Sequence, residues 1–137
     1  MAPLVAVVDD DVSVRESLDG LIRSVGLEVR VSASAEEFLN SPQSRKPDCL
    51  VFDVRLPGMS GIELHRHLVA QQCNVPVIFM TAHDSDGRAR SEAASDWTVA
   101  YLTKPLSDDE FLGAVAAALK LGPNAWNTAA EPGDSHE

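Results

Sequence analysis

Residues 50–61 read LVFDVRLPGMSG. Together with Cys49, the first three residues form an apolar run that is typical of a strand buried on both faces of a parallel sheet. The run stops at Asp53, and Pro57 and Gly58 then favour a turn before the next element. We therefore expect Asp53 at the carboxyl end of a central strand.

Similar apolar runs occur on both sides of this stretch, and helical patterns separate them. The predicted strands are residues 4–8, 28–31, 49–53, 77–80 and 99–102. Strands that alternate with helices form right-handed βαβ crossovers, which place helices on both faces of a parallel sheet. The sequence therefore predicts a single α/β domain with a doubly wound, five-stranded parallel sheet flanked by five helices.

Serine marks three of the predicted helix starts. Ser13, Ser34 and Ser107 are each followed three residues later by Glu, the spacing at which the two side chains bond free backbone N–H groups. Apolar residues at helical spacing follow each serine. Two further helices are predicted over residues 62–72 and about 86–95, and the second of these has no wide apolar stripe.

Length and composition suit one domain with one hydrophobic core. The chain has 137 residues, and 45% of them are hydrophobic. We expect the domain to span residues 1–122. Residues 123–137 are rich in Pro, Gly, Asn, Ser and Glu, which predicts a flexible acidic tail or linker.

Charge and composition also exclude several classes of function. The formal net charge is −10, and Arg and Lys are scattered, so we expect no direct nucleic-acid binding by this chain. No apolar run approaches the ~20 residues that span a bilayer, and the start resembles no secretory signal. Two cysteines are too few for a disulfide framework or a four-ligand zinc site. These features favour a cytoplasmic protein without membrane contact.

In an open α/β sheet, ligands bind beyond the carboxyl ends of the strands. Those ends carry carboxylates, a hydroxyl and an ammonium, on Asp9, Asp10, Asp11, Asp53, Thr81 and Lys104. Clustered carboxylates raise one another's pKa, so a hard cation with oxygen ligands, Mg²⁺, is the expected partner. Mg²⁺ and Lys104 would neutralise a phosphoryl group that Asp53 attacks, and Thr81 offers it a hydroxyl. Asp11 has a second interpretation, as a helix cap.

Four stretches resemble the receiver domains of two-component response regulators. They are residues 7–11 (VVDDD), 50–61 (LVFDVRLPGMSG), 77–82 (VIFMTA) and 101–105 (YLTKP). Within the second, DVRLPGMSG is especially similar to receivers of the FixJ-like branch, the nitrogen-fixation regulators. The resemblance covers about residues 3–121. It implies a flavodoxin/CheY-like sheet of strand order 2-1-3-4-5.

The same resemblance implies a function. Asp53 would accept a phosphoryl group from the phosphohistidine of a sensor histidine kinase, and the chain would then change conformation to control a partner or output. Mg²⁺ would be held by Asp10, Asp53 and the backbone carbonyl of Arg55, with Asp9 acting through water. The protein would be a signalling receiver rather than an enzyme, with at most self-phosphorylation and self-dephosphorylation at Asp53.

Three more roles follow from the resemblance. Thr81 and Lys104 would bind the phosphoryl group. Thr81 and Tyr101 would form the switch, in which the rotamer of the tyrosine reports the state of the site. Arg55 and His83, each two residues after a site residue, would tune the rate at which the acyl phosphate hydrolyses.

The connection ahead of the last strand departs from the family pattern. Receivers usually carry Ala-Gly-Ala there, whereas residues 95–98 read SDWT and place Trp97 where Gly is expected. The stretch between Thr81 and Lys104 is also one residue longer than usual. Trp cannot take the backbone angles or close packing that Gly permits. We expect residues 84–97 to hold a short or irregular fourth helix, with Trp97 over its end or on a partner-binding surface.

Other interpretations remain beside the receiver. The chain is either a stand-alone regulator, which the absence of a helix-turn-helix pattern favours, or the N-terminal receiver part of a longer transcription regulator. An Asp-nucleophile phosphatase of the haloacid-dehalogenase type needs a second Asp where this chain has Arg55. A degenerate receiver acting as a scaffold would have lost acidic residues that this chain keeps. The sequence leaves open whether the protein is a monomer or a phosphorylation-dependent dimer.

Overall fold

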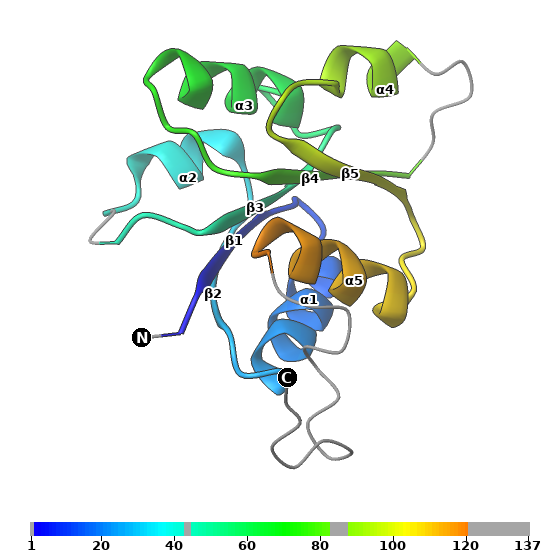
Figure 1. Ribbon diagram of the computed structural model, residues 1–137. Helices are drawn as coiled ribbons and strands as arrows, with labels where there is room; N and C mark the ends of the chain where they lie inside the picture. The colour runs from blue at the N-terminus through cyan, green and yellow to red at the C-terminus, as the bar shows by residue number, and fades with distance from the viewer. Residues whose placement is uncertain (1, 43–44, 83–87, 121–137) are drawn as a thin grey trace.

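The computed structural model describes residues 2–42, 45–82 and 88–120. Strands and helices alternate along the chain (Figure 1). The strands are β1 (Leu4–Val8), β2 (Glu28–Ser32), β3 (Cys49–Asp53), β4 (Val77–Thr81) and β5 (Thr98–Thr103). The helices are α1 (Val12–Ser24), α2 (Ala35–Asn40), α3 (Gly61–Ala70), α4 (Arg88–Ala93) and α5 (Asp108–Ala118).

The five strands form one sheet of order β2-β1-β3-β4-β5, and every neighbouring pair is parallel. Helices α1 and α5 lie side by side on one face, and α2, α3 and α4 cover the other (Figure 1). The predicted fold class and strand order are therefore confirmed. Among the described residues, no helix is long and apolar enough to cross a membrane.

Alternate residues of the central strands point into two separate apolar layers. In β1, Ala6 and Val8 belong to the layer under α2 and α3, whereas Val5 and Val7 belong to the layer under α1 and α5. The same alternation occurs in β3 and β4, and every residue of these three strands is buried. Burial on both faces explains why these strands read as continuous apolar runs.

Serine caps two helices as the sequence predicts. The Ser34 hydroxyl accepts a hydrogen bond from the backbone N–H of Glu37 at 3.0 Å, at the start of α2. The Ser107 hydroxyl accepts one from Glu110 at 2.9 Å, at the start of α5. Each bond satisfies a backbone donor that has no partner within its helix.

The starts of α1 and α3 differ from the prediction or add to it. The cap of α1 is Asp11 and not Ser13, because the Asp11 carboxylate accepts a hydrogen bond from the Ser13 backbone N–H at 2.8 Å. Asp caps helices as well as Ser does, and Asp11 comes first in the chain, so the helix already begins at Val12. At the start of α3, Ser60 and Glu63 form a complete capping box, which was not predicted from the sequence.

Helix α4 ends earlier in the chain than the segment predicted for it. It spans six residues, Arg88–Ala93, and Ala93 is buried against the core. After it, the Ser95 hydroxyl accepts a hydrogen bond from Trp97 N–H at 3.2 Å, and the Thr98 hydroxyl donates to the Ala93 carbonyl at 2.6 Å. Side-chain hydroxyls therefore hold the atypical connection. Residues 83–87, part of the predicted irregular segment, lie outside the described residues.

Strand β5 contains one residue more than its pairing with β4 requires. Val77 pairs with Thr98 and Ile78 with Ala100, so Val99 between them has no partner in β4. This register shift is a β-bulge, in which two residues of one strand face one of its neighbour. It gives β5 one residue more than the facing stretch of β4.

Candidate functional site

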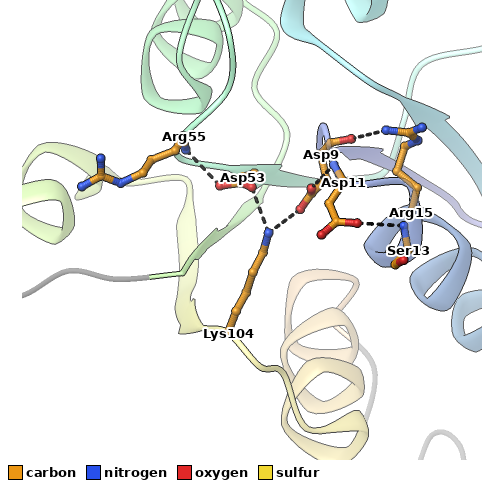
Figure 2. A network of polar contacts seen from close by, with 7 residues as sticks. All are labelled: Asp9, Asp11, Ser13, Arg15, Asp53, Arg55 and Lys104. Atoms are coloured by element: carbon orange, nitrogen blue, oxygen red, sulfur yellow. Dashed lines mark hydrogen bonds and ion pairs between the residues drawn. The ribbon is translucent and has the colours of Figure 1, made fainter.

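Four strand ends bring the predicted site residues to one edge of the sheet. Asp53 closes β3 and Thr81 closes β4, while Asp9 directly follows β1 and Lys104 directly follows β5. Because the strands are parallel, these ends face the same way. Figure 2 shows the side chains of Asp9, Asp53 and Lys104 pointing toward one another above this edge.

The Lys104 ammonium lies between two buried carboxylates. Its Nζ donates to Oδ2 of Asp9 at 2.7 Å and to Oδ2 of Asp53 at 2.9 Å. Asp9 is fully buried and Asp53 is 5% exposed. The Lys104 backbone N–H also donates to the carbonyl of Thr81 at 2.8 Å, which fixes the end of β5 beside β4. Charge-assisted bonds of this length are strong, so the ammonium is firmly placed.

Asp10 adds a third carboxylate on the exposed side. Oxygens of Asp9, Asp10 and Asp53 all lie within 4.8 Å of one another. Three carboxylates and one ammonium leave an excess of two negative charges. A set of carboxylate oxygens with this excess charge suits a hard divalent cation such as Mg²⁺. The donor set therefore fits the cation that the sequence predicts.

Burial and charge shift the pKa of two groups in this cluster. Burial raises the pKa of the Asp53 carboxyl above its usual value, and the neighbouring Asp9 adds to this, although Lys104 and the Arg55 backbone N–H act in the opposite direction. Burial alone would lower the pKa of Lys104, but Asp9 and Asp53 outweigh it and raise that pKa. The ammonium therefore stays charged, and a further cation would favour ionised Asp53.

Backbone donors bond the two buried carboxylates, and one guanidinium bonds the main chain of Asp9. Oδ1 of Asp9 accepts from Asp11 N–H at 2.8 Å, and Oδ1 of Asp53 accepts from Arg55 N–H at 2.9 Å. The Arg15 guanidinium donates to the Asp9 carbonyl at 2.8 Å. In Figure 2 the side chain of Arg55 points away from Asp53. The loop after β3 therefore contributes its backbone, not the arginine charge, to Asp53.

The remaining predicted site residues have different surroundings. Thr81 is fully buried. Tyr101 is half-buried in β5, with the Arg90 guanidinium 4.7 Å from the centre of its ring. Asp11 caps α1. His83 lies outside the described residues.

Sequence reasoning missed Arg15 and the role of Gly61. The position of Arg15 on the first turn after Asp11 was a usable signal, because that turn lies beside the end of β1. Gly61 begins α3, and a Cβ on it would lie 2.1 Å from the carbonyl oxygen of Asp53. Only glycine fits there, which brings α3 directly against the end of β3.

We expect Gly61→Ala to lower the free energy of unfolding by about 2–3 kcal/mol, because the backbone around Asp53 must move to admit the methyl group. Urea denaturation followed by circular dichroism measures this. Gly20→Ala, within α1, is the matched control, since no atom lies within 4 Å of its added Cβ. That variant should gain about 0.5–1 kcal/mol, and a similar gain for Gly61→Ala would contradict the close contact.

A second feature lies at the opposite edge of the sheet. A cleft of about 690 Å³ is lined by residues that precede β1, β3, β4 and β5, by Val99 and by the end of α5. Trp97, 36% exposed, lines it. The expectation that Trp97 packs over the end of the fourth helix or marks a partner-binding surface stays a prediction, and the structure places Trp97 on this cleft together with the end of α5. This cleft is separate from the acidic cluster, which lies at the carboxyl ends of the strands.

Known proteins share this sequence pattern. The model of the response regulator receiver domain family matches residues 5–116. Response regulator protein TodT of Pseudomonas putida is 39% identical over 128 residues, which cover 93% of this chain and 56% of TodT. Nodulation protein W of Bradyrhizobium diazoefficiens is 45% identical over 115 residues, 84% of this chain and 50% of that protein. The chain thus spans about half the length of these relatives.

Solved structures share the fold. FixJ-N matches with a TM-score of 0.77 and 34% identity, over 88% of this chain and 95% of that one. A response regulator receiver protein from Burkholderia phymatum matches with a TM-score of 0.76 and 43% identity, over 88% of this chain and 97% of that one. Together with the family match over residues 5–116, these findings show that the chain belongs to the response regulator receiver domain family.

Proposed function

We propose that this chain is a phosphorylation switch that accepts a phosphoryl group on Asp53 from a sensor histidine kinase. The observation that carries the proposal is the Lys104 ammonium, bonded to Asp53 at 2.9 Å beside Asp9 and Asp10. A carboxylate attacks a phosphoryl dianion only where positive charge offsets their repulsion. Lys104 supplies part of that charge next to the attacking group.

Mg²⁺ would supply the rest. Asp10, Asp53 and the backbone carbonyl of Arg55 would hold it, with Asp9 acting through water. Bound there, the cation stabilises the charge that develops on the phosphoryl oxygens. The excess of two negative charges in the cluster and its oxygen-only donors support this assignment.

The transfer itself needs only Asp53 as the attacking group. One of its carboxylate oxygens forms the new O–P bond while the P–N bond to the kinase histidine breaks, and the imidazole leaves with the electron pair. Lys104 would bind one phosphoryl oxygen, and the Thr81 hydroxyl would bind another. Beyond phosphorylation and dephosphorylation of its own Asp53, the chain would perform no chemistry.

The switch would run from Thr81 to Tyr101. When the Thr81 hydroxyl moves toward the phosphoryl group, the space beside it changes, and the Tyr101 ring would change rotamer. Such a change would alter the contact between that ring and the Arg90 guanidinium. Exposed Arg55, and His83, would tune the lifetime of the acyl phosphate from their positions after Asp53 and Thr81.

What the phosphorylated chain would control is proposed only from the proteins to which it is similar. FixJ of Bradyrhizobium diazoefficiens, 37% identical over 114 residues, is named a transcriptional regulatory protein, and this chain spans 55% of it. The proposed receiver covers residues 1–122, with residues 123–137 as tail or linker. It would act in the cytoplasm either through protein partners or as the receiver part of a transcription regulator, as a monomer or a phosphorylation-dependent dimer. We propose no nucleic-acid or membrane binding by this chain itself.

An Asp-nucleophile phosphatase is the less favoured alternative. Such an enzyme needs a second carboxylic acid two residues after the nucleophile to protonate the leaving group. Arg55 occupies that place, and its exposed side chain points away from Asp53 (Figure 2).

Asp10→Ala should weaken Mg²⁺ binding by about tenfold or more, because it removes one of three carboxylates from the cation site. Isothermal titration calorimetry with MgCl₂ measures the Kd, and phosphorylation by acetyl phosphate should slow in the same variant. These two measurements test the proposed function.

Asp11→Ala is the matched control, because the Asp11 carboxylate caps α1 instead of joining the cluster. Loss of the cap should cost about 1 kcal/mol of stability and leave the Kd for Mg²⁺ unchanged. Equal Mg²⁺ affinity in the Asp10 variant and the unmodified chain would place the cation elsewhere.

A further inference from the structure

The loop between β3 and α3 carries the proposed metal ligand at Arg55, and its near end is tied to the core of the sheet. Arg55 N–H donates to Asp53 Oδ1, and the N–H of Val54 donates to the carbonyl of Met80 at 2.8 Å. The far end is tied to α3, where Ser60 N–H donates to Glu63 at 2.9 Å. The stretch between these ends turns through solvent-exposed Pro57 and Gly58.

Helix α2 reaches this turn through one side chain. Oε2 of Glu36, in the first turn of α2, accepts a hydrogen bond from the backbone N–H of Met59 at 3.1 Å. Gly58, with φ +75°, lies so close that a Cβ on it would be 2.8 Å from the same carboxylate oxygen. Glycine therefore serves twice here, since it adopts the left-handed backbone angle and leaves room for Glu36.

The same two segments also pack against one apolar layer. Leu56 and Met59 of the loop, and Leu39 of α2, pack against the core layer that contains Phe38. Glu36 lies on the first turn of the helix that carries Phe38, and its hydrogen bond with Met59 adds a link between loop and helix on the solvent side. Loop and helix are thus held in place by the core layer on the buried side and by the hydrogen bond on the solvent side.

We propose that Glu36 is a positioning residue for the phosphorylation site: by holding Met59 N–H, it fixes the loop that presents the Arg55 carbonyl and the Asp53 carboxylate to Mg²⁺. The inference rests on the proposed function. It assigns a role to a side chain outside the acidic cluster, on an element that contributes none of the proposed ligands. Because Glu36 acts through the loop, its loss changes the geometry of the site and leaves all the ligands in place.

Three variants separate this role from a general effect on α2. Glu36→Ala removes the acceptor and should weaken Mg²⁺ binding by about three- to tenfold. This loss is no larger than the smallest losses of affinity seen when residues that hydrogen-bond metal ligands are mutated. Glu36→Gln keeps an acceptor oxygen at the same reach and should retain the affinity of the unmodified chain. Glu36→Asp keeps the charge but shortens the side chain by one carbon, so it should lose affinity as the Ala variant does.

Glu37→Ala is the matched control, because Glu37 lies in the same helical turn and accepts from Ala33 N–H at 2.5 Å instead of touching the loop. Its Kd for Mg²⁺ should equal that of the unmodified chain. Amide hydrogen exchange without Mg²⁺ gives a second readout: the Met59 N–H should exchange faster in the Glu36→Ala and Glu36→Asp variants only.

The outcomes distinguish this inference from the proposed function. If the unmodified chain binds no Mg²⁺, the proposed function itself fails. If it binds Mg²⁺ and both the Ala and the Asp variants bind it equally well, only the positioning role of Glu36 is wrong. Should Glu36→Ala fail to fold, Glu36→Asp still decides, since it keeps a carboxylate in the first turn of α2.

Discussion

We expect the Asp53→Asn variant to gain no phosphoryl group from acetyl phosphate and Mg²⁺, under conditions in which the unmodified chain gains one. The amide keeps the size of the side chain but cannot act as the attacking carboxylate. Intact-mass spectrometry measures the added group directly. Of all the variants considered, this one should have the largest effect on function, because no neighbouring group replaces the attacking oxygen.

Asp19→Asn is the control for this experiment, since Asp19 pairs with Arg23 on the exposed side of α1, away from the cluster. It should be phosphorylated normally. Undiminished labelling of the Asp53 variant would move the acceptor to another residue, and the remaining candidates in the cluster are Asp9 and Asp10.

In the absence of Mg²⁺, the Asp53→Asn variant should also be more stable than the unmodified chain, by about 1 kcal/mol near neutral pH. Burial raises the pKa of Asp53, so ionising this group costs the folded state more than the unfolded state. The gain should therefore shrink as the pH falls through the raised pKa and vanish below the pKa of an unfolded Asp, about 3.9. Urea denaturation across this range measures it.

Lys104→Met should have the largest effect on stability, a loss of about 3 kcal/mol, because it leaves Asp9 and Asp53 buried without their cation. Phosphorylation should be impaired as well, whereas Mg²⁺ binding should persist, since Lys104 repels the cation instead of binding it. Denaturant titration with and without Mg²⁺ tests both points, and Mg²⁺ should restore part of the lost stability.

The pH dependence of this effect has a definite sign. The raised pKa of Lys104 means that its stabilising contribution is fully present below the pKa of an unfolded Lys, about 10.4, and is lost as the pH rises through the folded value. In the Met variant, the stability should instead increase as the pH falls and the Asp53 carboxyl, whose pKa burial raises, becomes protonated. Lys46→Met, at an exposed position, should show neither change. If both variants behaved alike, Lys104 would be an ordinary surface lysine.

The sequence predicted the strands well because the central three are buried on both faces. Continuous apolar runs of that kind have few alternative interpretations once helical patterns lie between them. The start of α1 was less accessible to sequence reasoning. Asp11 and Ser13 are both good caps, and only the three-dimensional path of the chain after β1 decides which one bonds a backbone N–H.

The part of the candidate site that lies at the carboxyl ends of the strands could be predicted from the sequence. The rule that parallel strands end at one edge brought Asp9, Asp53 and Lys104 together before any distance was known. Contacts from elements that add no ligand were not accessible in this way. The bond from Glu36 to Met59 joins residues 23 positions apart, and no local pattern records it.

The bulge at Val99 has a consequence for solubility. β2 and β5 are the two edge strands of the sheet, and an exposed edge is a template on which another chain can add a sixth strand. On β5 the unpaired Val99 breaks the regular spacing of backbone donors and acceptors. On β2, Glu28, paired with Arg45 at 2.8 Å, places charges along the edge. Addition of a strand from another molecule is therefore disfavoured at both edges of the sheet. Backbone irregularity opposes it at β5, and charge opposes it at β2.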